Sequence, residues 1–314
     1  MTTTRDAVRV DSPGALCAML PHLCGFTPSE SLALVWMHGG SVVVTQRIDV
    51  DALDLDTAAL AATIPASVVV ESDRLAAVIV SDARTVSPDD VDRLTAALDQ
   101  AAPGVEVLDV LHIRHGRWSS LLCDNPECCP PDGTPLDPDA PAVVEMIARG
   151  SAPEASRAVA VEPWATGPDS TPRLPALPTG AALESWRDTV LADPLAFDLA
   201  DVLRDVRVRD VVLWQAARGD LDALDVLAAC RLSCADTHPL DVAPVATVGA
   251  CLLWSAGGST ARAGAALTTA QAAEPDYSLA LLVAQSMAAG LPPAVWADAM
   301  RSLDFRTVRH GSDA

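Results

Sequence analysis

The chain has 314 residues, half of them hydrophobic, which is enough to bury the cores of two ordinary domains. Its 42 acidic residues outnumber its 21 basic residues, and the formal charge of -21 makes nucleic acid and anionic membranes poor partners. All of these basic residues are arginine. The sequence therefore excludes P-loop nucleotide sites, protein kinases and Schiff-base enzymes, each of which needs a lysine amine.

Two features of the sequence bear on the compartment. Residues 1–11 mix threonine with charged residues and lack the apolar core of a secretory signal. The longest apolar stretch, residues 242–256, is shorter than the roughly 18 to 20 residues of a membrane span and contains Pro244 and Gly249. We therefore expect a cytoplasmic protein whose eight cysteines are thiols or metal ligands, not disulfides.

The first half of the chain alternates between helical and strand periodicity. The helix predicted at residues 87–101 begins with Ser87-Pro88-Asp89-Asp90, a strong start signal. Two further helices and five strands are predicted in this half: helices at 12–23 and 57–64, and strands at 32–37, 42–48, 75–80, 105–113 and 118–122. This order predicts an α/β domain over residues 1–150. Its sheet is mixed, with about five strands, because two of the connections are hairpins.

The second half is predicted to be helical. A short helix at residues 142–149 precedes a proline-rich segment at 151–180, which we interpret as an extended linker or a strap across the surface. Seven helices follow, at residues 181–191, 199–217, 221–230, 242–254, 260–273, 279–289 and 293–303. They predict an all-α domain of helical hairpins over residues 181–305, followed by a tail at 306–314.

Weak internal similarity in the helical half suggests a repeat. The sequence from Leu213 to Gly219 is echoed by the sequence from Leu253 to Gly258, a period of about forty residues that is typical of stacked helical hairpins. Residues 258–280 are similar to the second helix of a tetratricopeptide repeat running into the next repeat, and an ordinary helical bundle is the alternative. In the same half, Asp198, Asp201 and Asp205 alternate with arginines, and we predict a solvated helix face there.

The densest cluster of reactive side chains is the run Cys123-Asp124-Asn125-Pro126-Glu127-Cys128-Cys129, directly after a predicted strand. Four residues separate Cys123 from Cys128, the outer limit of the spacing with which one loop presents two thiolates to zinc, and Cys129 could supply a third. No fourth ligand is local. It would have to come by folding from another part of the chain: His112, His115, Cys17, His22 or Cys24.

Two other interpretations of these cysteines remain open. Thiol redox chemistry is one, although the adjacent Cys128 and Cys129 would form a strained eight-membered ring and the nearby Asp124 and Glu127 would raise a thiol pKa. The other is that the cysteines are small apolar residues buried beneath a proline-rich loop.

A second patch, Leu20 to Ser31, contains a histidine, a thiol, hydroxyls and a carboxylate within one short stretch. The structural interpretation is that Gly25 ends a helix and Phe26 anchors in the core. The functional interpretation is a small-molecule hydrolase or ligand-binding pocket at the sheet edge, for which His22, Ser29, Ser31 and His112 would have to converge.

Several blocks of the sequence together resemble a known family. They are Leu20 to Pro28, Val105 to Val110 with Gly116-Arg117-Trp118, the Cys123 to Pro131 loop running into Gly133-Thr134-Pro135-Leu136, Asp276 to Ala280, and Gly290 to Pro293. Their order resembles an uncharacterised, alanine-rich domain-of-unknown-function family, number 4192, of high-GC Gram-positive bacteria. The resemblance implies a cytoplasmic protein with no assigned reaction and no catalytic residues to transfer.

The sequence therefore favours a non-catalytic protein-interaction or regulatory module that binds an unidentified protein partner through its helical hairpins and has no cofactor. The first alternative is a thiol-metal protein that holds zinc at Cys123, Cys128 and Cys129. The second is the sheet-edge hydrolase or ligand-binding pocket.

Overall fold

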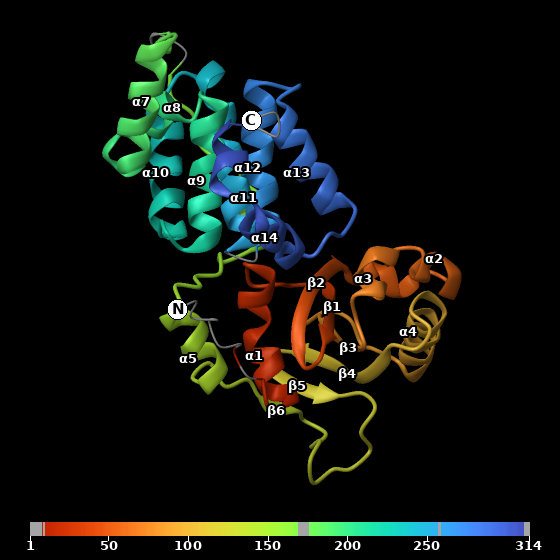
Figure 1. Cartoon of the computed structure of the whole chain (residues 1–314). Helices are drawn as coiled ribbons and strands as arrows, with labels where there is room; N and C mark the ends of the chain where they lie inside the picture. Colours follow the sequence, from red (N-terminus) through yellow and green to blue (C-terminus); the bar gives the residue numbers. More distant parts are fainter. Residues whose placement is uncertain (1–7, 9, 169–175, 257–258, 311–314) are drawn as a thin grey trace. The chain divides into compact units, whose positions relative to one another are not determined.

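The computed structural model describes residues 8, 10–168, 176–256 and 259–310, apart from the side chain of residue 67. The chain divides into two compact units, Met1–Val159 and Ala160–Ala314 (Figure 1). We call them the N-terminal and the C-terminal unit. The division falls within the segment predicted to be proline-rich linker or strap.

A six-stranded mixed sheet forms the centre of the N-terminal unit, in the order β2-β1-β3-β4-β5-β6. β3 and β4 pair in parallel and the other neighbours are antiparallel. The strands are β1 Ser31–His38, β2 Ser41–Asp49, β3 Arg74–Val80, β4 Glu106–Arg114, β5 Arg117–Ser120 and β6 Thr134–Pro135. The predicted α/β class with a mixed sheet is confirmed, and β6 is the strand that the sequence did not indicate.

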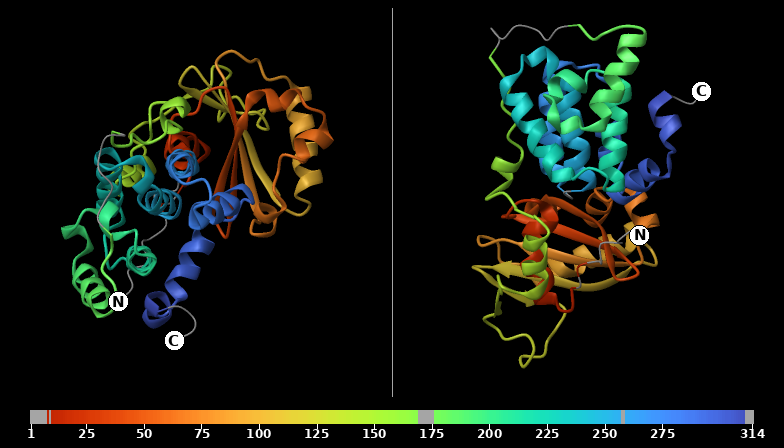
Figure 2. Two further views of the ribbon diagram at one scale, coloured as in Figure 1. Left: turned by 90° about the horizontal axis from the view of Figure 1, so that it is seen from above. Right: turned by 60° about the vertical axis from the view of Figure 1, so that its left-hand side comes forward.

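Helices cover both faces of this sheet (Figure 2). α2 and α4, which contact each other, lie on one face with α3, whereas α1 and α5 pack together on the other. The helical elements of the unit are α1 Pro13–Cys24, η1 Val50–Asp54, α2 Thr57–Ala61, α3 Ala66–Val70, α4 Pro88–Ala101, α5 Pro141–Ala148 and, at the unit boundary, α6 Arg157–Ala160.

The side chains of β1 point alternately to the two faces of the sheet and are apolar on both, which explains why two helical layers are needed. Leu32, Leu34 and Trp36 belong to the core beneath α4, while the intervening Ala33 and Val35 are also fully buried. A strand that is apolar on both faces is stable only when both faces are covered. The crossover from β3 to β4 runs through α4, which begins at a capping box formed by Ser87 and Asp90, as its sequence indicated.

All described elements of the C-terminal unit are helical, which confirms the predicted all-α class. They are α7 Ala181–Ala192, η2 Pro194–Ala196, α8 Leu199–Val202, α9 Val206–Arg218, α10 Ala223–Asp236, η3 Pro239–Asp241, α11 Ala243–Ser255, α12 Thr260–Ala273, α13 Ser278–Ala288, α14 Pro293–Ser302 and α15 Phe305–His310. α11 lies at the centre and contacts α9, α10, α12, α13 and α14. No helix among the described residues combines the length and the apolarity that a membrane crossing requires.

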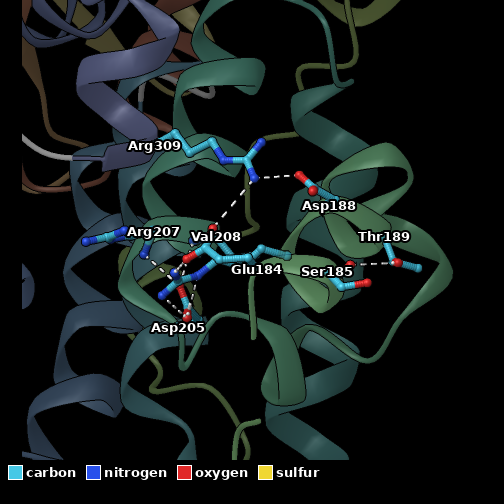
Figure 3. Close-up of polar contacts among 9 residues, drawn as sticks. Glu184, Ser185, Asp188, Thr189, Asp205, Arg207, Val208 and Arg309 are labelled. Carbon is cyan, nitrogen blue, oxygen red and sulfur yellow. Dashed lines mark hydrogen bonds and ion pairs between the residues drawn. The ribbon is translucent and has the colours of Figure 1, made fainter. Parts of the chain in front are cut away.

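The helix predicted at residues 199–217 is interrupted. The predicted solvated face is wrong at Asp205 and Arg209, which are buried, whereas Asp198 and Arg207 are exposed. Asp205 ends the run and caps α9 by accepting hydrogen bonds from the backbone N–H groups of Arg207 and Val208 (Figure 3). Asp205 is only 5% exposed, and its carboxylate receives two hydrogen bonds from Arg187, at 3.0 and 2.7 Å. Arg209 is also buried and donates to the Tyr277 hydroxyl at 2.7 Å. The first part of the predicted tail forms α15, which packs on α9.

Part of the proline-rich segment lies against the helices of the C-terminal unit. The backbone N–H of Trp164 donates to Thr269 Oγ1 at 2.8 Å, and that of Gly167 donates to the Cys234 carbonyl oxygen at 2.9 Å. The Trp164 ring occupies the space that a Cβ on Gly249 would need. Residues 163–168 therefore form a strap across the surface and not a free linker, and we call them the strap below. Residues 169–175 lie outside the described residues.

Candidate metal centre

The loop between β5 and β6, residues 121–133, brings together the three cysteines named from the sequence. The sulfur atoms of Cys123, Cys128 and Cys129 all lie within 4.8 Å of one another. The Sγ atoms of Cys123 and Cys128 are 3.1 Å apart, and those of Cys128 and Cys129 are 3.7 Å apart. Cys128 is exposed and the other two are partly exposed, so the interpretation as buried apolar residues does not fit.

A tight turn at Asn125 folds the loop back on itself. The Asn125 carbonyl oxygen accepts hydrogen bonds from the N–H groups of Cys128 and Cys129, at 3.2 and 2.8 Å. Its side-chain oxygen accepts another from the N–H of Glu127 at 3.0 Å, which is the local bonding that asparagine provides in turns. This turn returns Cys128 to the position next to Cys123.

The base of the loop is fixed where it returns to the sheet. Arg117 donates to the carbonyl oxygens of Asp132 and Gly133, both at 2.7 Å. Gly133 has a φ of +70°, and a Cβ there would lie 2.9 Å from the carbonyl oxygen of Trp118, so only glycine fits. The base of the loop is therefore held in place by these contacts, although the loop itself is exposed.

Hydrogen bonds shift the pKa values of Cys123 and Cys128 in opposite directions. The pKa of Cys123 is lowered, first by the hydrogen bond from Cys128, then by the backbone N–H of Asn125 and by Cys129, while Asp109 on β4 opposes the effect. The pKa of Cys128 is raised to about 12, mainly because Cys128 hydrogen-bonds to Cys123 and then to Cys129. Cys123 is therefore the more acidic thiol of this pair.

Three converging thiolates suit a thiophilic ion such as zinc or copper(I). A zinc–sulfur bond of about 2.3 Å in a tetrahedral site places the sulfur atoms about 3.8 Å apart. The separation of 3.7 Å between Cys128 and Cys129 already fits this geometry. The 3.1 Å between Cys123 and Cys128 would have to widen slightly, which an exposed loop allows.

None of the five side chains considered as a fourth ligand joins the cluster. Among the described residues, the one group of three or more histidine, cysteine or carboxylate ligand atoms within 4.8 Å of one another is the three loop cysteines. The candidates that remain outside are His22, His112, His115, Cys17 and Cys24. Burial raises the pKa of Cys17 and of Cys24 to about 12, which disfavours the thiolate that a metal ligand must be. A fourth ligand would be a water molecule or an external group.

Three of the four side chains of the sheet-edge pocket, those of His22, Ser31 and His112, form hydrogen bonds elsewhere. His22 Nδ1 lies 2.9 Å from Ser151 Oγ, and His112 Nε2 lies 3.3 Å from the carbonyl oxygen of Ser81. Ser31 Oγ donates to the backbone oxygen of Ser29 and not to its hydroxyl. Within the described chain, no hydrogen bond links two of these four side chains. The structural interpretation holds, because Gly25 ends α1 in the left-handed region and Phe26 is buried.

One polar cluster at the carboxyl ends of the parallel strands was not predicted. The Glu30 carboxylate accepts hydrogen bonds from Ser81 Oγ at 2.6 Å and from the Asp82 N–H at 3.1 Å, and Asp82 Oδ1 accepts one from the N–H of His115 at 2.6 Å. The bond from Ser81 is the main reason why the pKa of Glu30 is lowered. Glu30 and His115 have positive φ values, 42° and 48°. The available signal was that Ser81 and Asp82 directly follow a predicted strand, where α/β sheets bind ligands.

Comparison with protein families identifies the chain. The model of a domain of unknown function, DUF4192, matches residues 13–186 and 178–294. The chain belongs to this family. The matched region of this DUF4192 protein includes the whole cysteine loop and the described strap, whereas most of α14 and all of α15 follow it. No curated protein and no solved structure matches the DUF4192 chain.

Proposed function

We propose that the protein is a thiol-metal protein, in which Cys123, Cys128 and Cys129 bind zinc. The observation that supports this proposal is the convergence of three sulfur atoms within 4.8 Å on one loop. The N–H of Asn125 donates to the Cys123 sulfur, and such a bond stabilises a metal thiolate by orienting it and delocalising its charge.

A metal ion would cross-link the loop at the point where the loop makes few contacts with the rest of the protein. The arginine and glycine contacts fix the ends of the loop, and the Asn125 turn shapes its middle, but the described contacts of the three sulfurs are mostly with one another. Three protein ligands leave the fourth position to water or to an incoming group, as in zinc sites that exchange a ligand. The site is accessible from solvent, because Cys128 is exposed and Cys123 and Cys129 are partly exposed.

Metal content of the purified, reduced full-length protein tests the proposal. We expect one zinc per chain in the wild type and none in the double variant Cys123→Ser, Cys128→Ser. Glu127→Gln is the matched control: it lies in the same loop, removes one charge and leaves the sulfur atoms in place, so it should retain the metal. A folded wild-type protein that takes up no zinc from a zinc-supplemented buffer would end the proposal.

We further infer that the C-terminal unit binds a protein partner and has no catalytic role. Neighbouring leucines of α13, Leu281 and Leu282, are 37% and 56% exposed, and adjacent exposed apolar side chains favour protein contacts. A photo-crosslinking residue at position 282 should capture one defined protein. The same residue at position 285, also exposed and one turn further along, is the control for proximity. Equal labelling of many proteins from both positions would contradict a specific interface.

A further inference from the structure

Cys123 and Cys128 form a pair whose geometry suits a second chemistry. Their sulfur atoms are 3.1 Å apart, about 1 Å more than a disulfide bond requires. The residues are separated by a turn and are not adjacent, so bond formation avoids the strained ring that Cys128 and Cys129 would form.

The geometry points to a redox-active dithiol at Cys123 and Cys128 that takes a low-molecular-weight disulfide as its oxidant. We take Cys123 as the attacking group, because it lies 3.1 Å from the Cys128 sulfur and stands apart from the adjacent Cys128 and Cys129 in the sequence. Cys128 is the resolving group, since it already lies against that sulfur and is exposed.

The reaction is thiol–disulfide exchange in two steps. In the first step the Cys123 thiolate attacks one sulfur of the oxidant; a Cys123–oxidant mixed disulfide forms and one small thiolate leaves. In the second step Cys128 loses its proton to solvent and attacks the Cys123 sulfur, and the second small thiolate leaves. Cys123 and Cys128 together lose two electrons, and the oxidant is reduced to two thiols.

The other cysteines should not compete with this pair. Cys17, Cys24, Cys230, Cys234 and Cys251 are buried, which denies access to the oxidant. Burial is also the largest cause that raises the pKa of each of them, so the reactive thiolate is disfavoured. Cys129 lies beside the pair but remains a thiol in the oxidised loop.

Disulfide formation would remove two of the three proposed metal ligands. This part of the inference rests on the proposed function: zinc and the Cys123–Cys128 disulfide would exclude each other, and an oxidant would release the metal. The dithiol chemistry itself needs no metal and is tested separately.

The first experiment treats reduced, chelator-treated full-length protein with glutathione disulfide and maps the products by alkylation and peptide mass spectrometry. We expect a Cys123–Cys128 disulfide with Cys129 free. Cys129→Ser should form the same disulfide, whereas Cys128→Ser should accumulate glutathione on Cys123. A main product linking Cys128 to Cys129, or a Cys129→Ser protein that forms no internal disulfide, would overturn the inference.

The second experiment treats zinc-loaded protein with glutathione disulfide and follows free zinc with a chromogenic chelator. Zinc should appear in step with the disulfide. If the reduced protein never holds zinc but forms the disulfide, the proposed function fails and the dithiol stands. If zinc is held at the loop and no disulfide forms, the dithiol fails and the metal site stands.

Discussion

Asp90 shows how one carboxylate can organise a helix start and the loop before it. It is buried at the beginning of α4 and accepts hydrogen bonds from the N–H of Ser87 at 2.9 Å, the Ser87 hydroxyl at 2.8 Å and Arg84 at 3.1 Å. Arg93 forms a second ion pair with it. Burial alone would raise the pKa of Asp90, but the bonds from Ser87 and Arg84 outweigh burial, and the pKa is lowered.

The pH dependence of Asp90→Asn follows from this direction. A carboxyl whose folded-state pKa lies below its unfolded value of 3.8 stabilises the fold above that pH, and the stabilisation is lost as pH falls through the folded-state pKa. At neutral pH we expect Asp90→Asn to lower the free energy of unfolding by about 1–3 kcal/mol, the usual cost of losing charged hydrogen bonds. The difference from wild type should shrink in urea titrations performed below pH 3.8.

Asp89→Asn is the matched control for this titration, because Asp89 is the exposed neighbour in the same helical turn. It should change the free energy of unfolding by no more than about 0.5 kcal/mol at neutral pH. A difference between wild type and Asp90→Asn that stays constant through the acid range would show that the Asp90 charge does not stabilise the fold.

At the level of elements, a charged network joins three helices of the C-terminal unit. Asp205 at the start of α9 pairs with Arg187 of α7, and Arg309 of α15 reaches Glu184 and Asp188 on the same α7 helix (Figure 3). The Arg187–Asp205 pair is buried, whereas Glu184 and Asp188 are exposed. Buried and exposed pairs should therefore differ in their contribution to stability.

Removing one partner of the buried pair should be costly. Arg187→Met leaves the Asp205 carboxylate buried without its arginine and should lower the free energy of unfolding by about 3–5 kcal/mol. Asp205→Asn keeps a good N-cap for α9, so the double variant should lose less than the sum of the single variants. Chemical denaturation of the four full-length proteins measures the coupling. Strict additivity of the Arg187→Met and Asp205→Asn effects would contradict the assigned pairing. Arg309→Met, which breaks more exposed pairs, should lower the free energy of unfolding by about 0–1 kcal/mol.

These elements also show what the sequence could and could not predict. The strands and helices with clear apolar periods, β1 and α4 among them, were placed within a few residues. The break between α8 and α9 was missed because apolar spacing continues across Asp205, and its partner Arg187 is distant in sequence. β6 was missed because a two-residue strand that contains Pro135 carries no periodic signal.

The candidate site was predictable in composition but not in geometry. Cysteine spacing identified the three loop sulfurs, since local sequence determines which residues share a loop. It did not show that Cys123 approaches Cys128 more closely than Cys129 does, because that depends on the turn at Asn125. It also did not show that distant candidates such as His112 stay away, because their positions depend on tertiary packing.

On the scale of the whole molecule, each unit has its own hydrophobic core. One core lies between the sheet and α4, and the other surrounds α11. The strap is packed as part of the C-terminal unit. Trp164 packs on α11 and α12, and the guanidinium of Arg231 lies 5.7 Å from the centre of the Trp164 ring. A domain boundary drawn where the predicted helices begin would therefore cut through a packed region.

The strap leads to a test with two fragments. Residues 160–314 should fold with a cooperative thermal transition, whereas residues 176–314 should melt at a lower temperature, because the second fragment exposes the surface around Gly249 that Trp164 covers. Trp164→Ala in the longer fragment should account for most of the difference, about 3 kcal/mol for a large aromatic side chain. Circular dichroism melting curves measure all three proteins. Equal midpoints for the two fragments would mean that the strap lies on the helices without stabilising them, and that the C-terminal unit begins at α7.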